Sequence, residues 1–275
     1  GKYAPSNRAA TKLLRNAAFK SAEQRRMIHL QMANNYHQLG QHSSSAKSYS
    51  EARKIQDDQL THSKLLDQLN AGKATAREIE PVAKDYAAKH PERDDRYRGL
   101  MMLVNAHLRE NNPNAAKSLL RNVLSLDAIT NNAAQLFVEQ NGSEPAQLAD
   151  SERVLREALK KNNRHAAYIR YTLAFPLYRD RLKDIEKTRA ILRELIERSP
   201  TADGYSKTAI TWLLDSAKDD NEFNAEVSRI LKSRREHPEL PALTRYLSDW
   251  RQSARRDSKR KDRVKLLEAA LAKAN

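Results

Sequence analysis

The chain has 275 residues, of which 39% are hydrophobic and 31% are charged, with only 6 glycines and 9 prolines. This composition favours helices and provides few of the turns that a sheet requires. It therefore predicts an all-α fold whose apolar side chains lie in narrow stripes. The absence of cysteine excludes disulfide frameworks, thiol nucleophiles and cysteine-ligated metal centres. Because no apolar run approaches about 18 residues, we expect no membrane span in this chain.

Positive charge is concentrated in three segments of the sequence. The 50 lysines and arginines outnumber the 35 acidic residues, which gives a formal net charge of +15, and residues 1–30, 151–190 and 251–275 carry +6 each. Such a surface favours acidic partners: nucleic acid, anionic lipid headgroups or acidic peptides. The leading Gly1 suggests a trimmed chain, so we expect a soluble protein of the cytoplasm or, if an upstream signal was removed, of a bacterial envelope.

Apolar periodicity and turn residues predict a series of helices without strands. We expect one continuous domain over 1–275, with an N-terminal capping helix over 1–20, repeats over 21–240 and a C-terminal capping hairpin over 241–275. The predicted helices cover 6–19, 22–39, 43–56, 58–70, 75–89, 95–111, 113–126, 129–141, 146–161, 164–180, 183–198, 203–218, 220–236, 241–256 and 258–273.

Prolines mark several of the predicted helix boundaries, because proline has no amide proton and clashes with the preceding helical turn. Pro91, Pro200 and Pro238 each follow the end of a predicted helix. Pro176 falls inside the predicted helix 164–180, so we expect that helix to be interrupted there.

A two-helix pattern recurs along the chain about every 35 residues. In each copy, a small residue on one helix is expected to receive a bulky residue from the other, which lets two antiparallel helices pack closely. Seven copies are predicted, and the later ones place the small position of their second helix near Tyr86 or Ala87, Val123, Ala158, Leu195, Ser233 and Ala270.

The first copy carries the most specific motif, Met32-Ala33-x-x-Tyr36-x-x-x-Gly40 followed by Ser45, Tyr49 and Ala52. This order resembles the tetratricopeptide repeat (TPR), a helix-turn-helix unit of about 34 residues. His29 and Asp57 stand where that pattern usually has Trp or Leu and a closing Pro. The resemblance implies a right-handed α-solenoid of about seven TPR-like units plus an N-terminal helix. It also implies a concave groove, lined by the first helix of every pair, that receives a peptide or a partner helix.

The resemblance suggests which side chains line that groove. Long Asn, Gln and Arg side chains can hydrogen-bond a ligand backbone, and Arg can bind a carboxylate through two hydrogen bonds. The alternative is that these are ordinary exposed polar residues, and that Trp212 belongs to the core. The candidate binding residues are Asn34, Gln38, Lys64, Gln68, Arg98, Asn105, Arg109, Arg170, Trp212, Arg245 and Arg255.

The sequence contains no recognisable catalytic or cofactor motif. It lacks G-x-S-x-G, H-E-x-x-H, G-x-G-x-x-G and Walker A sequences. The fragment Gly72-Lys73-Ala74-Thr75 follows no predicted strand and lacks the first glycine of a phosphate loop. The eight histidines show no i, i+4 pair beside a carboxylate suited to a metal. We therefore expect no catalysis, no metal and no cofactor.

Two further interpretations stay open beside a non-catalytic scaffold that binds a peptide or partner protein. Arg251, Arg255, Arg256, Lys259, Arg260, Lys261, Arg263 and Lys265 could bind nucleic acid or an anionic surface, or could simply keep a terminal hairpin soluble. Aromatic residues make up only 6% of the chain, which disfavours base stacking. The chain could also be an accessory domain of a larger envelope or enzyme assembly.

Overall fold

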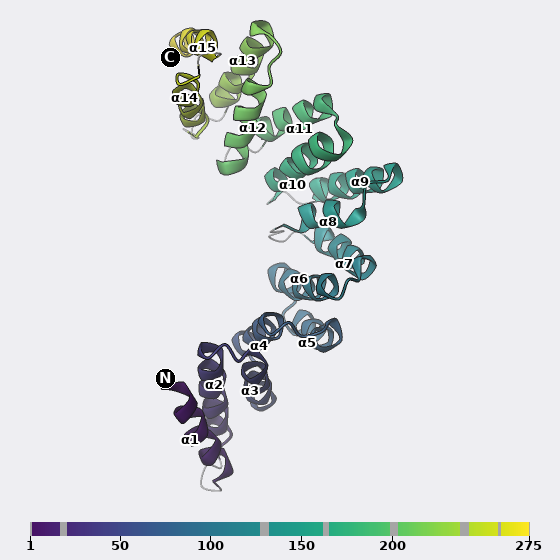
Figure 1. The fold of residues 1–275 in the computed structure, drawn as a ribbon, viewed down its shortest axis with the longest axis vertical. Coiled ribbons are helices and arrows are strands. Elements are labelled where there is room, and N and C mark those ends of the chain that lie inside the picture. Colours follow the sequence, from purple (N-terminus) through teal and green to yellow (C-terminus); the bar gives the residue numbers. More distant parts are fainter. Residues whose placement is uncertain are drawn as a thin grey trace. The chain divides into compact units, whose positions relative to one another are not determined.

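The computed structural model describes residues 2–16, 21–126, 132–161, 165–198, 203–236, 242–257 and 260–274. Within these residues every regular element is a helix and no strand occurs, which confirms the prediction of an all-α chain (Figure 1). The helices belong to two compact units, Gly1–Ala133 and Ala134–Asn275. No helix in the described ranges is long and apolar enough to cross a bilayer.

In the first unit, each helix packs against the helix that follows it in the chain, and α4 also contacts α6. The predicted helix ends agree with these bounds to within two residues, except for α1, which starts three residues and ends four residues earlier than predicted. The helices are α1 (Tyr3–Arg15), α2 (Ala22–Gln38), α3 (His42–Ile55), α4 (Gln59–Ala71), α5 (Ala76–Lys89), α6 (Arg93–Arg109) and α7 (Pro113–Ser125).

Local side-chain chemistry fixes several of these helix ends. Thr75 caps α5 in a reciprocal capping box with Glu78, and the Asp58 carboxylate accepts a hydrogen bond from the Thr61 amide at the start of α4. Gly40 has a φ of +68° directly after α2, a left-handed conformation that glycine adopts without steric cost. These caps keep the loops between helices to a few residues.

The small and bulky residues of the first repeat meet between α2 and α3. Ala33, Ser45 and Ala52 are fully buried and Tyr49 is nearly so. The Ser45 hydroxyl also donates a hydrogen bond to the Ala33 carbonyl oxygen, at 2.8 Å. The packing predicted for this motif is therefore present in the structure.

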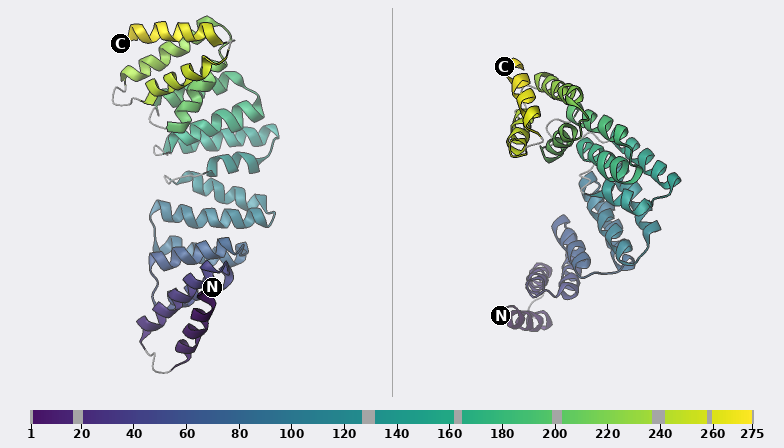
Figure 2. Two further views of the ribbon diagram at one scale, coloured as in Figure 1. Left: turned by 60° about the vertical axis from the view of Figure 1, so that its left-hand side comes forward. Right: turned by 45° about the horizontal axis from the view of Figure 1, so that its top comes forward.

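In the second unit, the helices from α9 onward contact their neighbours in the chain, and four pairs of alternate helices also touch: α10 with α12, α11 with α13, α12 with α14 and α13 with α15. Figure 2 shows the teal and green helices of this unit lying in successive layers. The elements are α8 (Ala133–Asn141), α9 (Pro145–Lys161), α10 (Ala166–Thr172), η1 (Leu173–Leu182), α11 (Ile185–Arg198), α12 (Asp203–Asp215), α13 (Asp220–Glu236), α14 (Ala242–Ala254) and α15 (Lys261–Ala274).

The helix predicted over 164–180 changes its winding at its centre. α10 ends at Thr172 and continues as η1, a π-helix that contains Pro176. Proline cannot donate the hydrogen bond of a regular α-helical turn, and wider π turns occur where that bonding pattern is broken. The predicted interruption is confirmed, whereas its form as a long π-helix was not predicted. Pro91 follows the end of α5 as expected, while Pro200 and Pro238 lie outside the described residues.

Candidate functional site

Three of the four predicted groove residues on α2 and α4 are exposed. These are Asn34 and Gln38 on α2 and Lys64 on α4. The Asn34 side-chain oxygen accepts a hydrogen bond of 2.7 Å from the Tyr49 hydroxyl, which holds the amide in one orientation. These positions are accessible, and their role in binding stays a prediction.

Gln68 differs from the other candidates because it is 95% buried, with 5% of its surface exposed. Its carbonyl oxygen lies 3.2 Å from Nδ1 of His37 and 3.1 Å from Nδ1 of His42. Both imidazoles can donate to this oxygen, so Gln68 links α2, α3 and α4 within the fold.

The candidates on α6 connect this helix to α4 and to the loop before α5. Arg98 forms an ion pair of 2.5 Å with Asp67 on α4. Arg109 donates to the Asn70 side-chain oxygen at 2.9 Å and to the Ala74 carbonyl at 3.0 Å. Both arginines are exposed, but these contacts use part of their hydrogen-bonding capacity. Asn105 is half-buried beside them on the same helix.

In the second unit, the candidates fall in different environments. Arg170 is buried and forms an ion pair of 3.1 Å with Glu194 on α11. Trp212 is half-buried on α12. Arg245 is exposed on α14, and Arg255, also exposed, forms an ion pair with Glu268 on α15. Trp212 also packs against the ring of Phe175.

Trp212 belongs to a group of five aromatic residues on α10, η1 and α12, which we call the aromatic row. Ring centroids are 5.8 Å apart for Tyr168 and Tyr205, 5.1 Å for Tyr171 and Tyr205, 4.9 Å for Tyr171 and Phe175, and 6.1 Å for Phe175 and Trp212. These tilted and edge-on contacts are the favoured arrangements of aromatic pairs. The five rings therefore form one chain of contacts across α10, η1 and α12.

The aromatic row is partly open to solvent. Phe175 is buried, whereas Tyr168, Tyr171, Tyr205 and Trp212 are each half-buried. Burial raises the pKa of Tyr168 to about 12 and raises the pKa of Tyr205 as well. The Tyr168 hydroxyl oxygen is itself buried, so this residue presents its ring rather than its hydroxyl to a partner.

A guanidinium group lies against the aromatic row at Phe175. The Arg179 guanidinium lies 4.6 Å from the centre of the Phe175 ring, within the range of a cation–π interaction. Arg179 is half-buried and forms an ion pair of 2.6 Å with the neighbouring Asp180. A partner on this surface would meet apolar rings, hydroxyl donors and one guanidinium.

The sequence analysis identified Trp212 but missed the four other members of the row. Tyr168, Tyr171 and Phe175 stand at i, i+3 and i+7, and Tyr205 precedes Trp212 by seven residues. Both spacings place side chains on one face of a helix, so this periodicity was a signal that could have been used.

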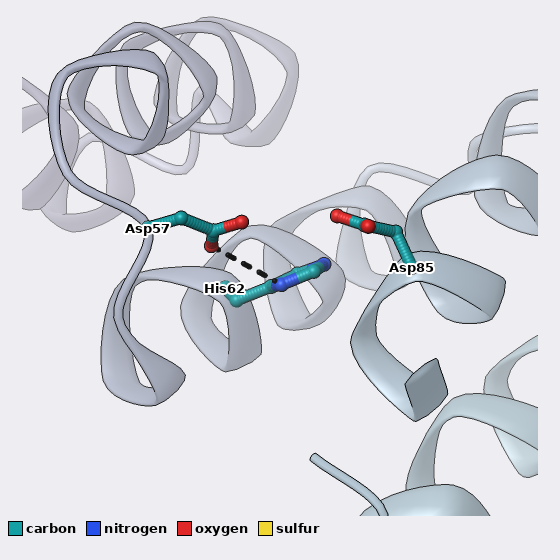
Figure 3. Close-up of side chains that lie close together, drawn as sticks. All are labelled: Asp57, His62 and Asp85. Atoms are coloured by element: carbon teal, nitrogen blue, oxygen red, sulfur yellow. Dashed lines mark ion pairs between the residues drawn. The ribbon is translucent and has the colours of Figure 1, made fainter. Parts of the chain in front are cut away.

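A second group of polar side chains comes together in the first unit, between α4, α5 and the residues before α4. Figure 3 shows the carboxylates of Asp57 and Asp85 on either side of the His62 imidazole. One potential ligand atom from each residue lies within 4.8 Å of the others. The Asp57 oxygen is 3.4 Å from Nδ1 of His62, which is fully buried.

This group is better explained as an ion-pair network than as a metal centre. Arg53 lies 3.2 Å from Asp57 and also contacts Asp85, while Lys89 lies 3.1 Å from Asp85 and also contacts Asp57. Two cations therefore already balance the two carboxylates. A metal ion would have to displace both while adding charge to a partly buried site.

The basic segment near the C-terminus makes several contacts within the fold. Arg260 lies 3.1 Å from Asp215 and 3.3 Å from Asp257, and Arg263 donates to the Ala217 carbonyl at 2.8 Å. Lys259 lies outside the described residues. Much of the local positive charge is thus offset by acidic groups and carbonyl oxygens of the same unit.

Comparison with known proteins identifies no relative. No protein-family model matches the chain, and a search of curated proteins finds no match. The function is therefore argued from the contacts and exposed surfaces of the chain itself.

Proposed function

We propose that this chain is a non-catalytic interaction scaffold that binds a peptide or a partner protein. In this proposal its helix pairs are TPR-like units, about seven in number with an additional N-terminal helix, and they wind as a right-handed α-solenoid. Handedness and repeat number come from the resemblance of the first repeat to the tetratricopeptide family. The observation that carries the proposal is the half-buried aromatic row on α10, η1 and α12.

The packing of alternate helices supports a stacked arrangement in the second unit. α10 contacts α12, and α12 contacts α14, so the first helices of successive pairs lie next to one another. Tyr171 of one pair touches Tyr205 of the next. In a stack of this kind, one face of the first helices forms a continuous surface for a ligand.

The chemistry of the row suits a polypeptide partner. Tyrosine and tryptophan provide large rigid contact areas with little loss of side-chain entropy, and they are enriched among residues that dominate binding energy. Contacts among the rings already restrict the rotamers before a ligand arrives. Catalysis would require reactive groups placed around a substrate, and the row offers none.

The proposal is tested by capturing partners on the immobilised chain, identifying them by mass spectrometry and measuring affinity for the main one. We expect Tyr171→Ala/Tyr205→Ala to weaken binding by more than about tenfold, because both rings lie in the open part of the row. Tyr3→Ala on α1 is the matched control, since Tyr3 is 40% exposed and lies outside the row. It should change affinity by less than about twofold.

Two results would overturn this proposal. One is unchanged affinity in the double tyrosine variant while circular dichroism shows it folded. The other is a partner that is nucleic acid, released steeply by salt and lost in Arg255→Ala/Arg256→Ala. The groove variant Arg98→Ala/Asn105→Ala, measured in parallel, shows whether the first unit also contributes to binding.

A further inference from the structure

The first unit contains a groove that the proposed function does not use. It has a volume of about 510 Å³ and is lined by residues of α3, α4 and α5 and of the loop before α5. Sites for small molecules typically enclose roughly 300–1,000 Å³. Leu65, Leu69 and Val82 supply the larger apolar side chains of its wall.

Two charged residues line the groove, and only the cation is without a partner. Lys47 is exposed on α3 and forms no ion pair with any residue that the structure describes. Glu78 accepts hydrogen bonds of 2.8 Å from both the amide and the hydroxyl of Thr75, as part of the cap of α5. These hydrogen bonds lower the pKa of Glu78, so its carboxylate stays charged and tied to Thr75, and Lys47 is the lining cation that can pair with an anionic ligand.

Gln68 contributes a second unused donor. Its carbonyl oxygen is held by His37 and His42, which leaves its amide nitrogen Nε2 without a hydrogen-bond partner in the described part of the chain. Gln68 lines the groove although it is 95% buried, with 5% exposed. An amide group that is fixed by two histidines and has free N–H groups is a preorganised site for a hydrogen-bond acceptor.

The start of α3 adds donors at the same groove. Its N-cap residue, Gln41, makes no side-chain capping bond, and Ser43 and Ser44 in the first turn line the groove. Uncapped amides at a helix N-terminus favour negative charge. Gly72 lines the groove beside this turn, where an added Cβ would lie 3.2 Å from the His42 Cβ, so a larger residue would crowd this end.

We propose that this groove binds an amphipathic carboxylate, a ligand that joins a carboxylate group to a short hydrocarbon chain. The carboxylate is recognised by Lys47, by the Gln68 amide and by the first turn of α3. The hydrocarbon chain packs on Leu65, Leu69 and Val82. The site lies entirely within the first unit, so a failure of this proposal and a failure of the proposal for the aromatic row can be told apart.

The test uses the full chain, labelled with ¹⁵N, and sodium octanoate as the probe, with acetate and 1-octanol as comparison ligands. Octanoate is expected to shift the Gln68 side-chain amide resonances and to bind at least about tenfold more tightly than either comparison ligand, because each of these lacks one half of the recognised chemistry. Lys47→Met should weaken the binding of octanoate about tenfold, so that its affinity approaches that of 1-octanol.

Lys84→Met is the matched control, because Lys84 is an exposed lysine of α5 that does not line the groove. It should leave octanoate affinity within about twofold. The proposal is overturned if octanoate leaves the Gln68 amide unshifted up to about 10 mM, a concentration that would largely fill a millimolar site. It is also overturned if Lys47→Met and Lys84→Met affect binding equally, since Lys47 has no ion pair to a described residue whose loss could perturb the fold.

Discussion

The protonation of His62 follows from its position between α4 and α5. Its Nε2 lies 3.0 Å from the Val82 carbonyl oxygen and donates to it, so in the neutral ring the unprotonated Nδ1 faces Asp57. Burial is the main cause that lowers the pKa of His62 below 6.5, and the nearby Arg53 adds to it. The folded chain therefore keeps this histidine neutral at a pH where the unfolded chain protonates it.

This difference predicts that the protein loses stability as the pH falls below about 6.5. The unfolded state then binds more protons than the folded state, which lowers the free energy of unfolding until the folded-state pKa is reached. Urea unfolding between pH 8 and pH 5 measures the slope, and this range avoids titration of Asp57 and Asp58. His62→Gln should reduce the slope.

His29→Gln is the companion variant, because burial also lowers the pKa of His29. The contribution of His29 to the pH dependence of stability must therefore be measured separately from that of His62. Each substitution should remove its own part of the pH dependence. An unchanged slope in His62→Gln would show that His62 does not titrate differently in the two states.

Between elements, polar contacts join helices that are not neighbours in the chain. Arg189 on α11 is the largest side chain that is essentially fully buried, with 1% of its surface exposed. It pairs with Glu222 on α13 and donates to the Ser216 carbonyl oxygen after α12. Its guanidinium also lies 6.0 Å from the Trp212 ring, beneath the aromatic row.

We expect Arg189→Met to lower the free energy of unfolding by about 3 kcal/mol, because it leaves a partly buried carboxylate and a carbonyl oxygen without their partner. Arg153→Met is the control, since Arg153 is exposed and, among the described residues, its ion pairs are with Asp150 and Glu157 on its own helix. That change should cost less than about 0.5 kcal/mol.

Denaturant unfolding measures the free energy of unfolding of both variants and of the unchanged protein. The double variant Arg189→Met/Glu222→Gln should regain part of the loss, because it removes the unpaired charge. Equal, small losses for Arg189→Met and Arg153→Met would contradict a structural role for the buried pair.

Sequence patterns predicted the helices well because caps, prolines and apolar spacing are local signals. Thr75 and Asp58 stand directly before helices that they cap, and both helices start within one residue of prediction. The binding surface was harder to predict. The burial of a side chain depends on what the neighbouring helices bring close to it. Trp212 is half-buried against Phe175, and Gln68 is 95% buried beside His42. No spacing within one helix contains that information.

At the largest scale that the clusters describe, the core of the first unit is divided into separate groups of side chains. In the first unit, Ile79 and Leu66 are fully buried in a cluster that also contains Tyr86 and Leu103, from α4, α5 and α6. A separate cluster contains Ala33, Ala46, Tyr49 and Leu65. Each cluster mainly holds together the helices that contribute to it.

We therefore expect Ile79→Ala to lower the free energy of unfolding by about 3 kcal/mol and to destabilise mainly the helices that share its cluster. Hydrogen exchange should accelerate most in α4, α5 and α6, whose side chains share the cluster. Within the same unit, α1 serves as the internal control because it contributes nothing to that cluster. Uniform acceleration across the first unit would show instead that it unfolds as a single cooperative block.

Six of the ion pairs between alternate helices have a similar separation along the chain. Arg26–Asp58, Arg53–Asp85, Arg98–Asp67, Lys187–Glu152, Arg189–Glu222 and Arg229–Glu197 are 31 to 35 residues apart. Gene duplication or loss of a complete helix pair would preserve the match between donors and acceptors on either side of the new junction. Gain or loss of a single helix would shift the register, so that the cations and carboxylates of alternate helices would no longer face each other. Length variation among descendants of this chain should therefore come in steps of about one helix pair.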